Sequence, residues 1–280
     1  IAFVRWHPEE GASELYSIWD DGSHLQRLAS KLPGRCLSPS SAPGSRVVAF
    51  AHEDRDARFD IWSLDLSSDR LIRLTDTPGC DRYPAWSPDS KYIAFIRWHH
   101  EDSYAQRKYE LWIMRADGDS ARPLVHSRDM LKEPTWSPDG SRIAFSVLGT
   151  LRSPAPGWFE GVSHIQVLVL ATGSVTNLTE GDSPAWSPCG DFIAFESDVE
   201  GAYNLYRIAA DGTQLVQLTD GPGNSREPAW SPDASRLLFS CDKTGDWELY
   251  VMQADGTRPS RVTTNPSQDD SEPTFCGRVP

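Results

Sequence analysis

Four histidines are candidates for metal ligation: His7, His52, His99 and His100. Each follows a short hydrophobic stretch and is itself followed closely by acidic side chains. Imidazole and carboxylate groups are common ligands of divalent metal ions. No HxxxH spacing connects the four residues, so the alternative interpretation is a hydrated loop surface without a metal.

Three glutamates could act together, because Glu133, Glu227 and Glu272 each stand directly before a proline in similar stretches of sequence. Arg82 lies one residue before the same slot in another stretch. Carboxylates that line one cleft focus the electric field, and like charges held close together recruit a cation. The sequence therefore suggests a site for a divalent cation or a basic peptide, and no other cofactor. The alternative is a slot that is merely hydrated in every copy.

An aromatic pair, Trp158 and Phe159, lies in a polar stretch, residues 147–163, that also contains Pro154 and Pro156. Prolines disfavour a strand inside a sheet, so we expect a loop. Exposed aromatic residues often anchor protein partners. The pair is therefore a candidate partner contact, or else it folds back onto neighbouring loops.

Charge and composition exclude several classes of function. The chain has 280 residues with 27 Lys+Arg against 40 Asp+Glu, a formal net charge of −13. A nucleic-acid binder needs a basic footprint, and an anionic membrane surface attracts basic segments. No apolar run approaches the roughly 18 residues of a membrane-spanning helix. We expect no nucleic-acid partner and no membrane insertion.

Common catalytic and metal-binding motifs are absent from the sequence. It contains no GxSxG, which weighs against an α/β-hydrolase, and no GxGxxG or phosphate loop. The five cysteines include no CxxC pair, which argues against a zinc or thioredoxin-type motif. One disulfide is possible, and the spacing does not select it.

The elements that position these residues follow from an internal repeat. Four segments are near copies of one another: PAWSPDSKYIAF (84–95), PTWSPDGSRIAF (134–145), PAWSPCGDFIAF (184–195) and PAWSPDASRLLF (228–239). Two partial copies end at Phe3 and Phe50, and in the second of these Leu37 is expected near the Trp position. The phenylalanines that end the six copies recur every 44–50 residues. Such a period is typical of a repeat architecture.

The first copy is divided between the two ends of the chain. The stretch PTFCG at 273–277 resembles the start of the repeat, and the chain begins with its continuation, IAF. A closed ring explains this division, because a terminal strand then completes the first sheet and removes an open edge. Each copy has four short strands separated by turn residues. We therefore predict an all-β fold: one domain, residues 1–280, forming a six-bladed β-propeller with four antiparallel strands per blade. The residues around Thr274 and Phe275 are predicted to pair beside 1–3.

The two faces of such a ring differ in sequence. The turns between first and second strands are short and repetitive, whereas the loops after second strands and between blades are long and varied. Functional residues concentrate on variable loops held by a rigid scaffold. We therefore expect the site on the variable-loop face and at the channel mouth.

The repeated pattern PAWSPDG…IAF…ADG…LT resembles the WD40-like (PD40) repeat of TolB-type β-propellers across nearly the whole chain. The resemblance implies that the PAW strand lines the central channel and that the setting is periplasmic or extracellular. We expect a non-catalytic scaffold that holds a protein or peptide. The alternative is a metal-assisted lyase or hydrolase acting on an acidic glycan, since some similar propellers use a histidine-bound metal.

Overall fold

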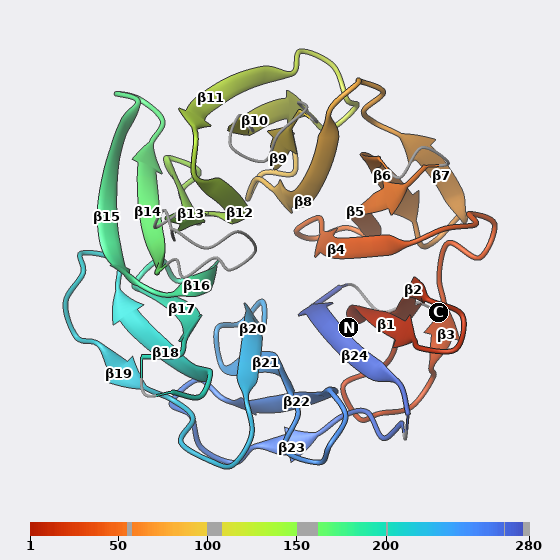
Figure 1. The fold of residues 1–280 in the computed structure, drawn as a ribbon, viewed down its shortest axis with the longest axis vertical. Coiled ribbons are helices and arrows are strands. Elements are labelled where there is room, and N and C mark those ends of the chain that lie inside the picture. The colour runs from red at the N-terminus through yellow and green to blue at the C-terminus, as the bar shows by residue number, and fades with distance from the viewer. Residues whose placement is uncertain (55–57, 100–107, 150–161, 200, 266, 277–280) are drawn as a thin grey trace, which may run out of the picture.

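The computed structural model is a closed ring of six four-stranded antiparallel sheets (Figure 1). It describes residues 1–54, 58–99, 108–149, 162–199, 201–265 and 267–276. Each sheet is one blade, and the described residues contain no helix that could span a membrane. The predicted all-β, six-bladed fold is confirmed.

The innermost strands of blades 1 to 6 are β24 (Asp269–Thr274), β4 (Cys36–Ser41), β8 (Cys80–Trp86), β12 (Met130–Trp136), β16 (Asp182–Trp186) and β20 (Ser225–Trp230). The second strands are β1 (Ala2–His7), β5 (Val47–Glu53), β9 (Tyr92–Trp98), β13 (Arg142–Leu148), β17 (Phe192–Ser197) and β21 (Arg236–Cys241). The third strands are β2 (Ala12–Ser17), β6 (Phe59–Asp65), β10 (Tyr109–Arg115), β14 (Ser163–Val169), β18 (Asn204–Ala209) and β22 (Glu248–Gln253). The outermost strands are β3 (Gln26–Arg27), β7 (Arg70–Arg73), β11 (Arg122–Ser127), β15 (Ser174–Glu180), β19 (Val216–Gln217) and β23 (Ser260–Arg261).

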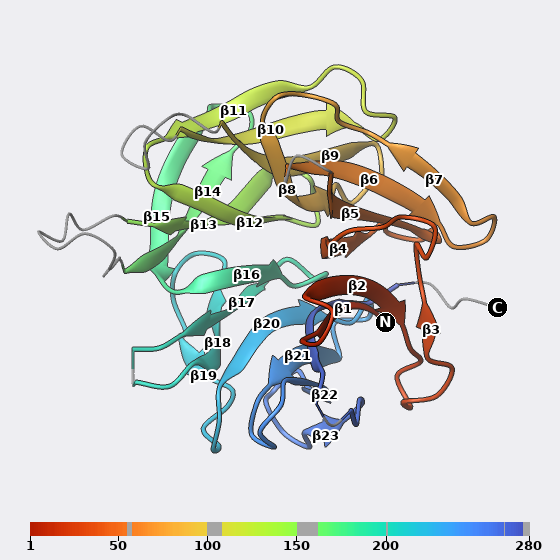
Figure 2. The same ribbon diagram turned by 45° about the vertical axis from the view of Figure 1, so that its right-hand side comes forward.

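The ends of the chain close the ring inside blade 1. Strand β24 pairs antiparallel with β1, and Thr274 lies opposite Ala2. Arg5 on β1 donates two hydrogen bonds, of 2.6 and 2.8 Å, to the buried carboxylate of Asp270 on β24. Figure 1 shows β24 between β1 and the central channel, and Figure 2 shows the N-terminus beside β1 in an oblique view. The predicted pairing of the two ends is confirmed.

The core lies between neighbouring blades and follows directly from the repeat. The phenylalanine of each second strand is at most 3% exposed: Phe3, Phe50, Phe95, Phe145, Phe195 and Phe239. One aliphatic residue of each third strand is at most 1% exposed: Leu15, Ile61, Leu111, Ile165, Leu205 and Leu249. Because a strand alternates its side chains between two faces, each blade offers an apolar surface to both neighbours.

In three blades, the threonine of the recurring Leu-Thr pair accepts the same hydrogen bond from the backbone of the third strand. The Thr75 hydroxyl accepts a hydrogen bond of 2.9 Å from the backbone N–H of Ile61 and donates to the carboxylate of Asp60. Thr219 and Thr263 accept the equivalent bonds in blades 5 and 6. The motif therefore satisfies backbone groups at the edge of the sheet.

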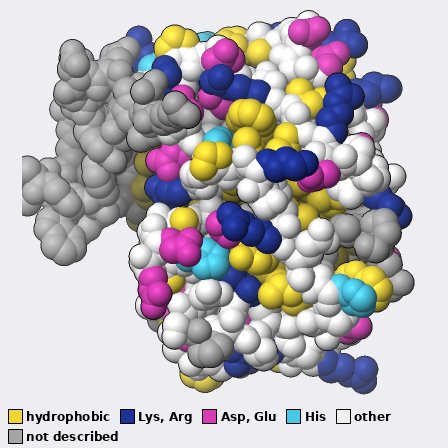
Figure 3. Space-filling model, turned by 90° about the vertical axis from the view of Figure 1, so that its right-hand side faces the viewer, with side chains coloured by type: hydrophobic (Ala, Val, Ile, Leu, Met, Phe, Trp, Pro, Cys, Tyr) yellow, Lys and Arg dark blue, Asp and Glu magenta, His cyan; other side chains and the backbone are white. Residues whose placement is uncertain are grey.

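The outer rim carries mixed charge. Figure 3 shows the side formed by blades 1 and 2, where Lys and Arg side chains alternate with acidic and apolar ones. Exposed pairs such as Lys31 with Asp69 contribute to this pattern. The coloured part of this view contains no large basic patch, in line with the acidic composition.

Candidate functional site

Each blade places one residue with positive φ at the same point of its innermost strand, directly before a proline. These residues have φ between 50° and 55°: Ser38, Tyr83, Glu133, Ser183, Glu227 and Glu272. We call them the pre-proline ring. Residues other than glycine rarely adopt this conformation, which costs about 1–3 kcal/mol each and tends to persist at functional sites.

A β-bulge produces this conformation. In blade 3, Arg82 lies opposite Ile96 and Ala85 lies opposite Ala94, so β8 contains one extra residue between the two pairs. All six innermost strands show a register shift at this point. A bulge redirects the side chain it carries. Here it turns the residue before each proline toward the central channel, where all six line one cavity.

The cavity has a volume of about 860 Å³ and is lined by all six innermost strands. It extends from the pre-proline ring to the prolines of the turns between first and second strands, such as Pro88 and Pro138. Among the described residues, none from the loops after the second strands lines it. The cavity therefore occupies the half of the channel on the tight-turn side, rather than the variable-loop side.

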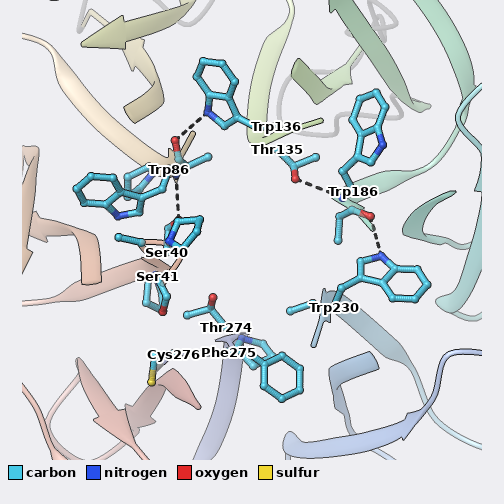
Figure 4. A pocket seen from close by; sticks show the side chains of 18 of the residues that line it. Ser40, Ser41, Trp86, Thr135, Trp136, Trp186, Trp230, Thr274, Phe275 and Cys276 are labelled. Carbon is cyan, nitrogen blue, oxygen red and sulfur yellow. Dashed lines mark hydrogen bonds between the residues drawn. The ribbon is translucent and has the colours of Figure 1, made fainter. Parts of the chain in front are cut away.

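The wall of the cavity is apolar and aromatic (Figure 4). Trp86, Trp136, Trp186, Trp230 and Phe275 occupy the same position in five blades. Two of these indoles are held from the preceding blade: Trp136 Nε1 donates to Ala85 O, and Trp230 Nε1 donates to Ala185 O, each over 3.0 Å. Trp136 and Trp230 thus join neighbouring blades and also line the cavity.

The floor of the cavity contains carboxylates that reach from one blade to the next. Glu227 Oε2 accepts a hydrogen bond of 2.6 Å from the backbone N–H of Glu272, and one of 2.9 Å from the Ser240 hydroxyl. Glu272 Oε2 accepts from the backbone N–H of Ser38. Burial, together with the neighbouring carboxylate of Glu272, raises the pKa of Glu227. Burial also raises the pKa of Glu272, although the Arg82 guanidinium opposes this effect.

Glu133 differs from the other two glutamates in its hydrogen bonding. Its Oε2 atom is buried and finds no hydrogen-bond partner among the residues that the structure describes, whereas Glu227 Oε2 and Glu272 Oε2 both accept hydrogen bonds. Its neighbour Lys132 pairs with the carboxylate of Asp182 on the next blade. Burial, with a contribution from Asp182, raises the pKa of Glu133 to about 8. The Lys132 ammonium and a hydrogen bond with Ser183 oppose this rise. A buried carboxylate oxygen without a hydrogen-bond partner is costly, so Oε2 is suited to receive a cationic group.

A layer of ion pairs lies one residue before the pre-proline ring, on the variable-loop side. Arg226 donates bonds of 2.8 and 3.0 Å to Glu196 Oε1, and Glu196 Oε2 accepts a bond of 2.7 Å from the backbone N–H of Glu227. Burial raises the pKa of Glu196, although Arg226 opposes it. The Arg82 guanidinium lies over the rings of Tyr83 and Phe59, 4.7 and 5.1 Å from their centroids. This layer fixes the strands that carry the ring.

The structure brings some of the sequence-predicted residues together. Glu227 and Glu272 are neighbours, whereas Ser183 of blade 5 separates Glu227 from Glu133. Arg82 stands beside the ring, and it is not among the residues that line the cavity. The three glutamates thus share one cavity, with Glu133 set apart from the other two.

The predicted histidine ligands are engaged within separate blades. His7 Nε2 lies 3.4 Å from Glu14, His52 Nε2 lies 3.0 Å from Pro33 O, and His99 Nε2 lies 4.0 Å from Glu110. In the described part of the chain, no three His, Cys, Asp or Glu side chains gather closely enough to hold a metal ion. His100, Trp158 and Phe159 lie outside the described residues. The metal site and the aromatic anchor stay predictions.

Sequence reasoning misplaced one position of the wall. Strand pairing shows that Ser41, opposite Val48, occupies the Trp position of blade 2, as Trp86 does opposite Ile93. Leu37 instead aligns with Arg82, ahead of the ring. The spacing to the recurring phenylalanine position indicates Ser41 as the equivalent of the tryptophan, because Ser41 precedes Phe50 by as many residues as Trp86 precedes Phe95.

A model of the TolB beta propeller domain family (PD40) matches residues 93–277. The chain belongs to this family. The Tol-Pal system protein TolB of Nitratidesulfovibrio vulgaris (strain Hildenborough) is 32% identical over 96 residues, which cover 32% of this chain and 20% of that protein. The chain therefore matches only a minor part of this relative's length.

Solved structures share the fold. TolB from Acinetobacter baumannii superposes with a TM-score of 0.79 at 20% identity, covering 98% of this chain and 65% of that one. An oligogalacturonate lyase in complex with manganese superposes with a TM-score of 0.60 at 15% identity, covering 90% and 71% of the two chains. At these identities the likeness establishes the propeller fold alone.

Proposed function

We propose that this protein is a non-catalytic binding propeller that holds a basic segment of a protein or peptide in its central cavity. The observation that carries the proposal is a cavity of about 860 Å³ with an apolar wall and a carboxylate floor. A lysine or arginine side chain matches this arrangement, because its aliphatic stem packs on apolar surface while its charged end seeks an anion. The tryptophans of the wall add favourable contacts with a cation.

Glu133 is the expected partner of the ligand's charge. Its Oε2 atom has no hydrogen-bond partner among the described residues, and burial raises the pKa of its carboxyl to about 8. A bound ammonium or guanidinium group would stabilise the carboxylate and lower that pKa. Binding should therefore strengthen as pH rises from 6 to about 8 and weaken as salt is added.

The sequence also suggests a divalent cation at the floor, since carboxylate oxygens ligate such ions. Among the described residues, however, no three acidic side chains lie closely enough to hold one, so a basic group is the favoured occupant. The variable-loop face remains part of the proposal as a second contact, through Trp158 and Phe159. We infer an extracytoplasmic setting, periplasmic or extracellular, from membership of the TolB propeller family. The glycan lyase or hydrolase alternative predicts stoichiometric manganese or zinc that depends on His52 and His99.

The test is selection from a random heptapeptide library displayed on phage, with the full chain as bait. Selected peptides should be enriched in Lys and Arg. Synthetic versions should bind wild type at least tenfold more tightly than the Glu133→Gln, Glu227→Gln, Glu272→Gln triple variant. The control is Glu180→Gln, an exposed residue on β15. No enrichment of basic residues, or equal binding by the triple variant, would refute the proposal.

A further inference from the structure

The aromatic wall of the cavity is interrupted at blade 2. Five blades place Trp or Phe at the wall position, whereas blade 2 places Ser41 there. Figure 4 shows Ser41 and Ser40 between Trp86 and Cys276, with no large side chain at Ser41's position. Blade 2 therefore leaves open a space that an aromatic ring fills in its neighbours.

The cavity reaches outward through this opening. Ala42, Pro43, Gly44, Ser45 and Arg46, the whole turn that follows β4, line it. From the corresponding turn of blade 3, only Pro88 is among the described residues that line the cavity. We call the opening formed by Ser41 and residues 42–46 the blade-2 notch.

Two buried hydrogen-bond donors beside the notch lack partners among the described residues. Ser41 Oγ and Trp86 Nε1 at its inner end are buried and have no hydrogen-bond partner in the described part of the chain. In contrast, the indoles of Trp136 and Trp230 donate to backbone carbonyl groups. Buried polar groups in native structures are nearly always paired, so unpaired ones call for an explanation such as a ligand.

Charge at the outer end of the notch is also unbalanced. The corresponding turn of blade 3 pairs Lys91 with Asp89, at 3.2 Å. Blade 2 has Gly44 in place of that aspartate, and the exposed Arg46 forms no ion pair with any described residue. A guanidinium together with indole and hydroxyl donors favours a carboxylate.

We propose that the blade-2 notch binds a carboxylate of the ligand and so fixes the direction in which the ligand lies. The inference rests on the proposed function: the ligand's basic group lies on the glutamate floor, and its chain passes Ser41 to reach Arg46. Ser38 of the floor lies on β4 and Ala42 of the notch directly follows that strand, so the two are separated by four residue steps along the chain. At about 3.3 Å per residue, an extended ligand spans this distance in about four residues.

The probes are three acetylated peptides of alanine and glycine with one lysine. The first has Asp four residues after the lysine and an amidated end, the second has Asn at that position, and the third ends there in a free carboxylate. Binding is measured by calorimetry at low salt. Wild type should bind the first or the third about three- to fivefold more tightly than the second, the range expected for a partly exposed ion pair. The tighter of the two identifies a side-chain or a terminal carboxylate as the source.

Variants locate the effect. Arg46→Gln should bind all three peptides equally, whereas Lys91→Gln, the matched substitution in blade 3, should keep the preference. Ser41→Trp restores the residue found at this position in four other blades, so it should fold normally and yet bind all three at least tenfold more weakly. Ser41→Ala, which keeps the opening but removes the hydroxyl, should still bind all three peptides, with a smaller preference for a carboxylate than wild type shows.

Different outcomes would overturn this inference and the function on which it rests. Equal binding of the three peptides by wild type, or a preference that survives in Arg46→Gln, would overturn the notch alone. Unchanged binding by Ser41→Trp would do the same. Failure of wild type to bind any of the three would contradict the proposed function itself.

Discussion

A residue directly before proline normally adopts an extended conformation, yet all six residues of the pre-proline ring adopt positive φ. The bulges that enforce this conformation recur in every blade, so the cost is built into the repeat. What varies is the side chain that each bulge turns toward the axis. Three positions carry glutamate, and the pKa of each carboxyl is raised by burial.

Glu133 should make stability depend on pH. Its folded-state pKa of about 8 lies above its ordinary value of 4.5, so the folded protein holds a proton that the unfolded chain releases. The free energy of unfolding should therefore fall as pH rises from about 4.5 to about 8. Glu133→Gln should remove this part of the loss and stabilise the protein at pH 9 by about 2 kcal/mol, a value discounted because the carboxylate borders the water of the channel.

Urea denaturation between pH 5 and 9 measures the effect. Glu180→Gln, on the exposed outer strand β15, is the control and should follow wild type. A Glu133→Gln variant whose stability falls with pH as steeply as that of wild type would show that this carboxyl is ionised without cost.

At the scale of the element, the tight turns show how one side chain fixes a reversal. Asp139 Oδ1 accepts from the Ser137 hydroxyl and, over 3.0 Å, from the backbone N–H of Ser141. These hydrogen bonds lower the pKa of Asp139 to about 2. Blade 5 has Cys189 at the same position, where the thiol makes a single contact of 3.3 Å with Ser187.

Asp139→Ala should lower the free energy of unfolding by about 1 kcal/mol at pH 7, since three hydrogen bonds to a carboxylate are lost. Cys189→Ala, the matched change in blade 5, should have almost no effect. Because the pKa of Asp139 is depressed, its contribution is present above about pH 4 and is lost as pH falls toward 2. Equal destabilisation by the two variants, measured by denaturant titration, would contradict this account of the turn.

The elements could largely be predicted from the sequence, and the site only in part. Strands and turns follow from repeated hydrophobic and Asp-Gly patterns, which act locally. The positive φ of Glu133 could not be predicted, because local preference opposes it and the paired strand imposes it. Ser41 is hard to assign because blade 2 has no tryptophan in its copy of the repeat, and the apolar Leu37 is the more obvious candidate for the Trp position. The side on which the cavity lies depends on how six strands meet, which no single repeat encodes.

At the scale of the whole molecule, closure of the ring is the property most exposed to test. A chain ending at Ser271 lacks the last residues of β24 and Phe275, and it leaves part of β1 as an open edge. It should lose at least about 3 kcal/mol of stability, because a core face is uncovered. A chain ending at Cys276 is the control and should melt like the full chain. Equal melting temperatures of the full chain and the two shortened chains, measured by calorimetry, would show that the C-terminal strand does not close the ring.

The central claim is that a basic segment binds in the cavity on the tight-turn side, and the indole N–H resonances of the protein test it most directly. Trp86, Trp136, Trp186 and Trp230 line the cavity, whereas Trp6 and Trp98 end second strands on the variable-loop side. Trp62 and Trp112 pack among the outer strands and serve as internal controls. Titration with a selected lysine-containing peptide should shift the four cavity indoles and leave Trp6, Trp98 and the two controls unchanged. Shifts confined to Trp6 and Trp98 would place the ligand on the opposite face and contradict the account.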